Sequence, residues 1–400
     1  MNILVICQYY TPEPFRVHDL CTELVNRGHT VQVVTGMPNY PLGELYHGYQ
    51  QNKPSDELKD GVRIHRCPIH PRKQGALHRV WNYYSFPAAA SRYLRSKAFR
   101  DRNAGKFDIV FVYQLSPVMM ALPGIRYAKK HHIPVILYCL DLWPESLLAG
   151  GVGRKSAVYR FFHRNSGNIY RSVDKLLITS SQFSDYLKNE FSISADRIAY
   201  LPQYAEELFT PLPSKQSDGV TDLLFAGNLG SLQSLDTILD AAARLKNEHI
   251  RFRIAGDGSV YEHLRQRVDR EELSNVQLLG RRPVEEMPAL YQSADAMLVT
   301  LKKDPVLSLT LPGKVQSYLA AGKPIIGAID GEAAKVIRDA RCGFCAPAED
   351  VSGLVQCIQA FVDAADKDEM ARNAAAYSRE HFSKEIFFDR LLSFISAELR

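Results

Sequence analysis

The sequence predicts an α/β protein with two Rossmann-like, doubly wound parallel-sheet domains that face each other across a cleft. Its 400 residues, with 46% apolar content, exceed what one hydrophobic core usually absorbs. Apolar, β-branched segments alternate with segments of helical periodicity along the whole chain, which is typical of parallel sheets covered by helices on both faces. Prolines and polar residues interrupt this pattern at 201–220, which indicates a linker.

These patterns place a first domain at residues 1–203, a second at 204–375, and a C-terminal helix at 376–400 that is expected to pack back toward the first domain. In the first half, strands are expected at 3–7, 31–35, 109–113, 135–139, 175–179 and 198–201, and helices at 16–27, 78–102, 118–131, 155–171 and 182–191. In the second half, strands are expected at 222–225, 251–254, 276–279, 296–299 and 324–327.

Composition narrows the class of protein. The N-terminal MNILVICQYY has neither a basic leader nor a cleavage site, so we expect a cytoplasmic protein. Its seven cysteines fit reduced thiols, and the only close pair, Cys342 and Cys345, is interpreted as part of a turn entering a strand rather than a zinc or redox site. No apolar run reaches the roughly 20 residues that span a bilayer. We expect no metal site and no cofactor.

In parallel sheets, ligands bind beyond the carboxyl ends of the strands, so the loops there carry the candidate site. Gly227 and Gly230 follow the strand expected at 222–225 and precede a helix, where backbone amides can approach a phosphate. A similar turn holds Gly256. Glycine turns are common in any fold, and neither turn is a GxGxxG fingerprint, which counts against a dehydrogenase.

A helix start at Pro312 is the strongest candidate for a diphosphate site. Pro312 suits the first turn of a helix and Gly322 its end. Thr310, Gly313 and Lys314 then supply a hydroxyl, free amides and an ammonium at one helix end. A surface lysine on an ordinary helix is the alternative. Glu332 follows a later strand at another helix start, where it could simply cap the helix.

The first half offers candidates for binding an acceptor. Asp141, Trp143 and Glu145 follow the strand expected at 135–139, and carboxylates with an indole suit sugar hydroxyls and rings. Glu13 and Arg16 lie between the first strand and first helix, so they are expected in the same crevice. Helix capping would explain either acid of the 141–145 segment alone.

These pieces together resemble glycosyltransferase family 4 of the GT-B fold. The similarity covers nearly the whole chain, in the stretches YYTPEP, NRGHTVQVVTGMPNYP, DLWPESL, FAGNLGSLQSLDTILDAA, IAGDGS, LYQSADAMLVTL, LPGKVQSYLAAGKPII and DGEAAKVI. DLWPES and the PGK helix start are most similar to bacterial surface-polysaccharide transferases of the fucosamine transferase type. The resemblance implies an acceptor-binding first domain and a nucleotide-sugar-binding second domain.

The sequence departs from the family at several positions. The E-x7-E pair would fall on Leu309 and Ser317, and the arginine and lysine that commonly hold the diphosphate on Asn228 and Gln233. A first-domain histidine is replaced by Asp141. The resemblance therefore implies that Gly230, Thr310, Lys314 and Glu332 carry more of the donor binding, with Arg281 or Arg282 as extra cations. The other residues expected in the donor site are Gly227, Asn228, Gln233, Gly256 and Gly313.

The resemblance implies a retaining, metal-independent transfer from a nucleotide sugar, expected to be UDP-linked. Lys314 and helix-end amides would stabilise the leaving diphosphate, which would itself take the acceptor proton, while Asp141 orients a hydroxyl. The expected products belong to O-antigen, capsule or related surface-polysaccharide synthesis, with an N-acetylated amino-deoxy sugar as one candidate for transfer. A sugar-nucleotide epimerase of the same architecture is the main alternative, and an exported solute-binding protein would need a signal that the N-terminus lacks.

An uneven charge distribution suggests a membrane partner. The net charge is only +5, but residues 63–106 hold eleven Lys and Arg against one acid, Asp101. One helical face against anionic lipid is expected from Arg92, Arg95, Phe99 and Arg102, with Trp81, Tyr83 and Tyr84 just upstream. A lipid-linked saccharide acceptor would be held there, at the inner membrane surface. A solvated helix face is the alternative. No nucleic-acid-binding module accompanies these bases, so nucleic acid is not expected as a partner.

Overall fold

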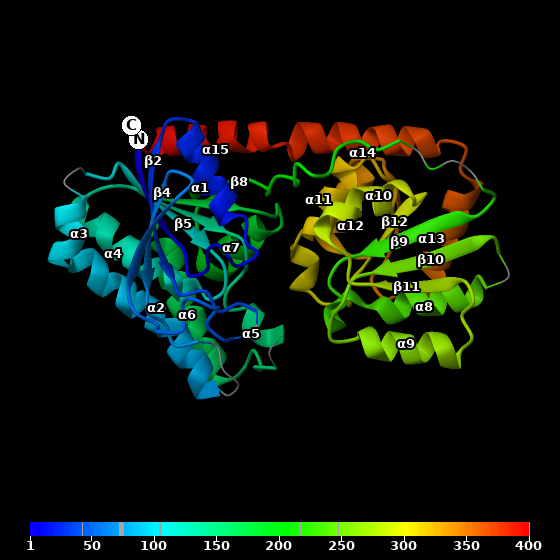
Figure 1. Cartoon of the computed structure of the whole chain (residues 1–400), viewed down its shortest axis with the longest axis horizontal. Helices are drawn as coiled ribbons and strands as arrows, with labels where there is room; N and C mark the ends of the chain where they lie inside the picture. The colour runs from blue at the N-terminus through cyan, green and yellow to red at the C-terminus, as the bar shows by residue number, and fades with distance from the viewer. Residues whose placement is uncertain are drawn as a thin grey trace. The chain divides into compact units, whose positions relative to one another are not determined.

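The computed structural model describes residues 1–41, 43–71, 76–103, 106–149, 151–213, 215, 218–246 and 248–399. The chain forms two compact units, each built around its own sheet (Figure 1). The first comprises Met1–Thr179, Phe183–Leu201 and Leu391–Arg400, and the second comprises Ser180–Gln182 and Pro202–Arg390. Two α/β units with mostly parallel sheets confirm the predicted fold class.

The first unit contains an eight-stranded sheet in the order β3-β4-β2-β1-β5-β6-β7-β8. All neighbouring strands are parallel except the edge pair β3 and β4. The strands are β1 Asn2–Ile6, β2 Thr30–Gly36, β3 Ser55–Lys59, β4 Val62–Cys67, β5 Ile109–Gln114, β6 Val135–Cys139, β7 Lys175–Ile178 and β8 Ile198–Tyr200.

Helices cover both faces of this sheet because the chain adds strands first on one side of β1, at β2 and β4, and then on the other side, from β5 to β8. Helix α1 connects β1 to β2, whereas α2 and α3 connect β4 to β5, and α2 packs on α4 (Figure 1). The helices are α1 Val17–Asn26, α2 Ala76–Arg95, α3 Lys97–Arg102, η1 Val118–Ala121, α4 Leu122–His131, α5 Ser146–Ala149, α6 Ala157–Arg171, α7 Phe183–Phe191 and η2 Ala195–Arg197.

The second unit contains a six-stranded, fully parallel sheet in the order β11-β10-β9-β12-β13-β14. The strands are β9 Thr221–Ala226, β10 Ile250–Ala255, β11 Val276–Gly280, β12 Ala296–Thr300, β13 Ile325–Ala328 and β14 Gly343–Ala346. The helices are η3 Ser231–Gln233, α8 Leu235–Arg244, α9 Tyr261–Arg270, η4 Val284–Glu286, α10 Met287–Gln292, η5 Leu307–Leu309, α11 Gly313–Ala320, α12 Gly331–Asp339, α13 Val351–Asp363, α14 Lys367–His381 and α15 Lys384–Glu398.

Two hydrophobic cores lie on the two faces of the second sheet. Along β12, Met297 and Val299 join the core formed with α10, α11 and α12, while Ala296 and Leu298 join the core formed with α8, α9 and α13. Successive strand residues point to opposite faces, so a strand buried on both sides is apolar at nearly every position. This explains why its sequence, AMLVT, shows no alternation of apolar and polar residues.

The structure corrects the sequence-based elements in the first unit. Strands β3 and β4 were not predicted, because β3 is the polar segment SDELK and β4 contains His65 and Arg66. Both side chains are buried against acidic partners on β3. The helix expected at 78–102 is two helices, because the Ser96 backbone is extended and its side chain accepts a hydrogen bond from the Phe99 amide as the N-cap of α3.

Candidate active site

The loop after β9 in the second unit is shaped by a close approach of two backbone segments. Gly227 and Gly256 both have positive φ, 143° and 140°. A Cβ atom on Gly256 would lie 1.8 Å from the Gly227 carbonyl oxygen, so no side chain fits there. The Gly227 amide donates to the Ala255 carbonyl at 3.0 Å. Glycine at both positions therefore brings the two predicted phosphate-binding loops into direct contact.

Lys314 extends toward this loop from the first turn of α11. Its Nζ donates to Gln233 Oε1 at 2.5 Å and lies 3.7 Å from the centre of the Phe225 ring. A Cβ atom on Gly227 would lie 3.4 Å from Lys314 Nζ. The structure thus brings Gly227, Gln233 and Lys314 together at the start of a helix, where backbone amides have no intrahelical partner. One ammonium, one amide and a helix end can together hold a diphosphate.

Tyr318, one turn beyond Lys314, was missed by the sequence analysis. Its hydroxyl donates to the Ala226 carbonyl at 3.0 Å and accepts from the Ala226 amide at 3.1 Å. Tyr318 is fully buried, so these bonds fix α11 to the last residue of β9, directly before Gly227. A tyrosine at i+4 on the face of Lys314 was the available signal, because a buried hydroxyl needs a partner.

Burial lowers the pKa of Lys314 from its ordinary value to about 7. A bound diphosphate favours the protonated ammonium, so nucleotide affinity should fall as the pH rises from 7 to 9. The Kd of UDP, measured by calorimetry across this range, should increase by up to about tenfold per pH unit above the pKa. In Lys314→Met the Kd of UDP should be larger than in the parent at pH 7 and nearly independent of pH. If the variant kept the pH dependence of the parent, Lys314 would not be the group that binds the diphosphate.

The other predicted donor residues surround this centre to different degrees. Asn228 is exposed, and its side chain lies against Gly230, where a Cβ atom would come within 2.8 Å of Nδ2. Gly313 is the exposed first residue of α11. The Thr310 hydroxyl donates to the Leu307 carbonyl at 2.8 Å, which ties the turn before the helix. Arg281 is exposed after β11. Their roles in donor binding remain predictions.

Glu332 has a protein partner where an open carboxylate was expected. It is 2% exposed in the first turn of α12. One carboxylate oxygen accepts from the Ser181 amide at 3.0 Å and the other from the Ser181 hydroxyl at 2.7 Å. Ser181 belongs to the three-residue segment that clusters with the second unit. Both carboxylate oxygens of Glu332 therefore hold this segment against the start of α12.

Asp141 is the predicted acceptor residue whose setting best fits chemistry. It follows β6 and is half-buried, and its carboxylate accepts from the hydroxyls of Ser116 and Ser146, the latter at 3.0 Å. Burial raises the pKa of this carboxyl, while the two serine bonds act in the opposite direction. A carboxylate oriented by two hydroxyls at a strand end can orient a substrate hydroxyl. Arg16 is half-buried before α1. Burial raises the pKa of Tyr113 and Tyr138, near the ends of β5 and β6, and the charge of Arg16 acts in the opposite direction.

The structure corrects the roles expected for three first-unit residues, because their side chains are buried and engaged. Trp143 is 2% exposed and its ring contacts Tyr83, so no sugar reaches its face in this structure. Glu145 is fully buried and accepts three hydrogen bonds, from Arg154, Tyr159 and Tyr186. Glu13 is 3% exposed and accepts from three backbone amides, those of Tyr10, Asn39 and Tyr40.

Among the described residues, no helix combines the length and apolar composition needed to cross a bilayer.

Comparison with known proteins identifies the class of this molecule. Residues 15–203 match the family model of the glycosyl transferase 4-like domain, and residues 220–364 match that of glycosyl transferases group 1. Two such domains in tandem define a glycosyltransferase. The chain therefore belongs to the glycosyltransferases with a 4-like first domain and a group 1 second domain, which confirms the family resemblance and the enzyme class predicted from the sequence.

The individual relatives have low sequence identity, but the matched regions cover most of the chain. The chain is 26% identical over 348 residues to the putative colanic acid biosynthesis glycosyl transferase WcaI of Escherichia coli, covering 80% of this chain and 82% of WcaI. It is 26% identical over 252 residues to the probable glycosyltransferase WbjE of Pseudomonas aeruginosa, covering 60% of this chain and 62% of WbjE. The crystal structure of Anabaena HepE with UDP superposes with a TM-score of 0.71 at 14% identity, covering 99% and 100% of the two chains.

Proposed function

We propose that this enzyme transfers a sugar from a UDP-linked donor to a lipid-linked saccharide during bacterial surface-polysaccharide synthesis, with retention of anomeric configuration. The observation that carries the donor half is the meeting of Lys314, Gln233 and Gly227 at the start of α11. The name of WcaI supports surface polysaccharide as the product class, and the UDP complex of a protein of the same fold supports the nucleotide. Our candidate for the transferred sugar is an N-acetylated amino-deoxy sugar, and a transfer assay with a panel of donors identifies it.

In the proposed reaction, the bond between the anomeric carbon and the diphosphate oxygen breaks, and the acceptor oxygen bonds to the same carbon. Lys314 Nζ and the first amides of α11 stabilise the negative charge that develops on the leaving oxygen. The leaving phosphate takes the proton of the acceptor hydroxyl. Asp141, itself held by Ser116 and Ser146, orients a sugar hydroxyl by accepting its hydrogen bond. We propose that these groups suffice without a resident metal, so chelation should leave turnover unchanged.

The experiment that tests the proposal is a transfer assay with purified protein and a panel of UDP-sugars and GDP-sugars, with and without lipid-linked saccharide extracted from a polysaccharide-producing bacterium. We expect nucleotide diphosphate release that requires acceptor, together with a product of increased mass. Conversion of a nucleotide sugar in the absence of acceptor would instead favour the epimerase. If the protein showed neither transfer nor conversion with any donor of the panel, the proposal would be refuted.

We further propose that the first unit docks on the inner membrane surface, through a face that keeps Trp81 but otherwise differs from the one expected. The expected face at 81–102 is broken by Ser96, and its Phe99 is only 2% exposed. Instead, α2 exposes Trp81 and α6 exposes Phe161, at 61% and 57%. Aromatic packing of Tyr83 on Phe162, with ring centres 6.0 Å apart, joins the two helices. Exposed Lys155 and Arg160 add positive charge, as membrane-surface helices do.

Replacing Trp81 and Phe161 together with serine should weaken binding to anionic vesicles by about tenfold or more, because both side chains lose apolar contact with lipid. Flotation with phosphatidylglycerol vesicles measures this effect. A matched control replaces Val284, which is 53% exposed in the second unit, with serine and should float like the parent protein. Equal flotation of the double variant and the parent would contradict this docking face.

A further inference from the structure

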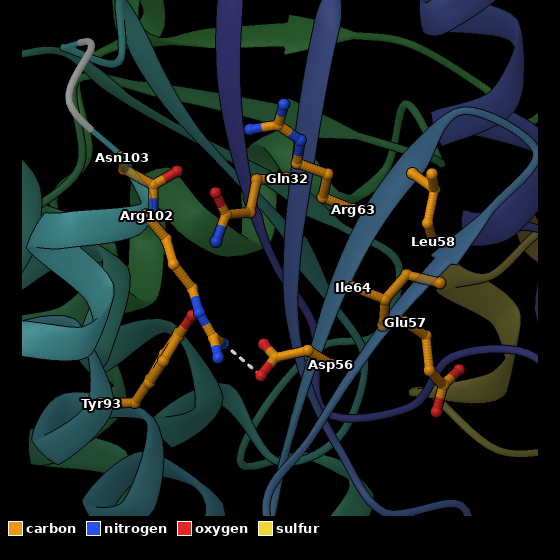
Figure 2. Close-up of a pocket in the computed structure, with 9 residues that line it drawn as sticks. All are labelled: Gln32, Asp56, Glu57, Leu58, Arg63, Ile64, Tyr93, Arg102 and Asn103. Atoms are coloured by element: carbon orange, nitrogen blue, oxygen red, sulfur yellow. Dashed lines mark hydrogen bonds and ion pairs between the residues drawn. The ribbon is translucent and has the colours of Figure 1, made fainter.

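A pocket lies in the first unit beside the edge strand β3, with a volume of about 410 Å³. Gln32 on β2 pairs in parallel register with Arg63 on β4, and both stand near the beginning of their strands. Asp141 follows the carboxyl end of β6, which runs parallel to β2 and β4. Gln32 and Arg63 therefore lie toward the opposite, amino-terminal ends of the parallel strands. It is lined by Gln32, Asp56, Glu57, Leu58, Arg63, Ile64, Tyr93, Arg102 and Asn103 (Figure 2).

The wall of this pocket is held in place by Asp56. Its carboxylate accepts a hydrogen bond from His65 Nδ1 at 2.8 Å and forms an ion pair with Arg102 of α3. The His65 ring stacks on the Tyr93 ring of α2, with centres 3.3 Å apart and planes 4° apart. Strand β3, strand β4 and helices α2 and α3 are thereby joined around the pocket, which makes its shape a fixed feature of the unit.

Two polar side chains of the pocket have no assigned partner among the residues that the structure describes. Gln32 is 6% exposed, and its amide points into the pocket toward Arg102 (Figure 2). Arg63 is exposed and lines the same pocket. The Gln32 amide faces the pocket and makes no hydrogen bond to a described residue, so it is free to donate to and accept from a ligand with hydrogen-bonding groups. The two acids, Asp56 and Glu57, are already paired with Arg102 and Arg66, which leaves the positive charge of Arg63 uncompensated.

We propose that this pocket binds one sugar ring of a saccharide chain, separate from the sugar that is transferred in the proposed reaction. An amide donates and accepts at once, so Gln32 matches a pair of neighbouring ring hydroxyls. Leu58 and Tyr93 give apolar surface for the ring, and Arg63 adds a preference for a sugar that bears a carboxylate. The volume lies within the roughly 300–1,000 Å³ of small-molecule sites. The choice of a saccharide as ligand rests on the proposed function.

The test uses saturation-transfer NMR on the full chain, with methyl glucoside and glucuronic acid as probes at millimolar concentration. We expect transfer to both probes, with the stronger signal for glucuronic acid. Gln32→Leu should lower both signals at least fivefold while preserving the fold, because leucine is similar in size but can neither donate to nor accept from a sugar hydroxyl. Arg63→Gln should lower the glucuronic acid signal selectively. Arg372→Gln, which removes an exposed arginine in the second unit, should change neither.

Signals that are absent in the parent protein, or equal in parent and Gln32→Leu, would overturn the pocket. The sugar-transfer assay separates this failure from that of the proposed function. A chain that transfers sugar yet binds probes identically in both forms refutes only the pocket. A chain that binds probes through Gln32 yet transfers no sugar supports the pocket and refutes the proposed function.

Discussion

Replacing Lys314 with methionine should lower kcat/KM for sugar transfer by about 10²–10³-fold, the usual effect of removing one preorganised group that stabilises developing negative charge. The ammonium lies 2.5 Å from Gln233 Oε1 and next to Gly227, at the helix end where the diphosphate is proposed to bind. Methionine keeps the length and packing of the side chain against Phe225 but carries no charge. Nucleotide diphosphate release, measured at saturating acceptor over a range of donor concentrations, gives kcat/KM for the donor.

The control for this variant is Lys335→Met on α12, which removes an exposed lysine paired with Asp339. Its kcat/KM should stay within about twofold of the parent, since surface ion pairs contribute little. The unfolding midpoint of Lys314→Met should equal or exceed that of the parent, because a poorly solvated charge is removed. Near-normal turnover in Lys314→Met would take this residue out of the mechanism.

Replacing Glu145 with alanine should lower the free energy of unfolding by about 3 kcal/mol or more, because two tyrosine hydroxyls lose a charged acceptor inside the protein. Glu145 is fully buried, and Tyr159 and Tyr186 donate to the same oxygen at 2.7 and 2.6 Å. Urea unfolding monitored by circular dichroism measures the loss. Glu145→Gln, which keeps an acceptor, should lose about half as much.

Arg154, the third partner of Glu145, provides a matched comparison. Its side chain is 53% exposed, so Arg154→Met should cost no more than about 1 kcal/mol. If Glu145→Ala instead kept full stability and raised the KM for the acceptor, the carboxylate would bind substrate as the sequence first indicated, and its structural role would be wrong.

Most of the fold could be predicted because its signals are local. A parallel strand buried on both faces is mostly apolar, as AMLVT of β12 is up to its final threonine, and a helix that begins after a proline is visible directly in LPGKVQSYL. Strand β3 could not be predicted, since SDELK is polar and becomes a strand only by pairing with β4. The same holds for His65 and Arg66, which are tolerated inside β4 only because Asp56 and Glu57 lie opposite them.

The site was predicted less completely than the fold. The Lys314 prediction depended on a helix terminus, a feature that sequence can place. Glu13, Trp143 and Glu145 were expected in the site because they follow strands, yet position in the chain does not tell whether a side chain points outward or inward. Three backbone amides around Glu13 and two tyrosines around Glu145 come from distant segments, so only the folded chain shows that these carboxylates are occupied.

The eight-stranded sheet ends in two strands that resist recruitment of further chains. At one border, β3 carries charges at three of its five positions and runs against the direction of its neighbours; at the other, β8 has only three residues. Short or charged borders leave few amides and carbonyls open for another molecule to extend the sheet. The first unit should therefore remain dispersed at high concentration, and an apolar substitution at the exposed border, such as Lys59→Val, should promote fibrillar self-association.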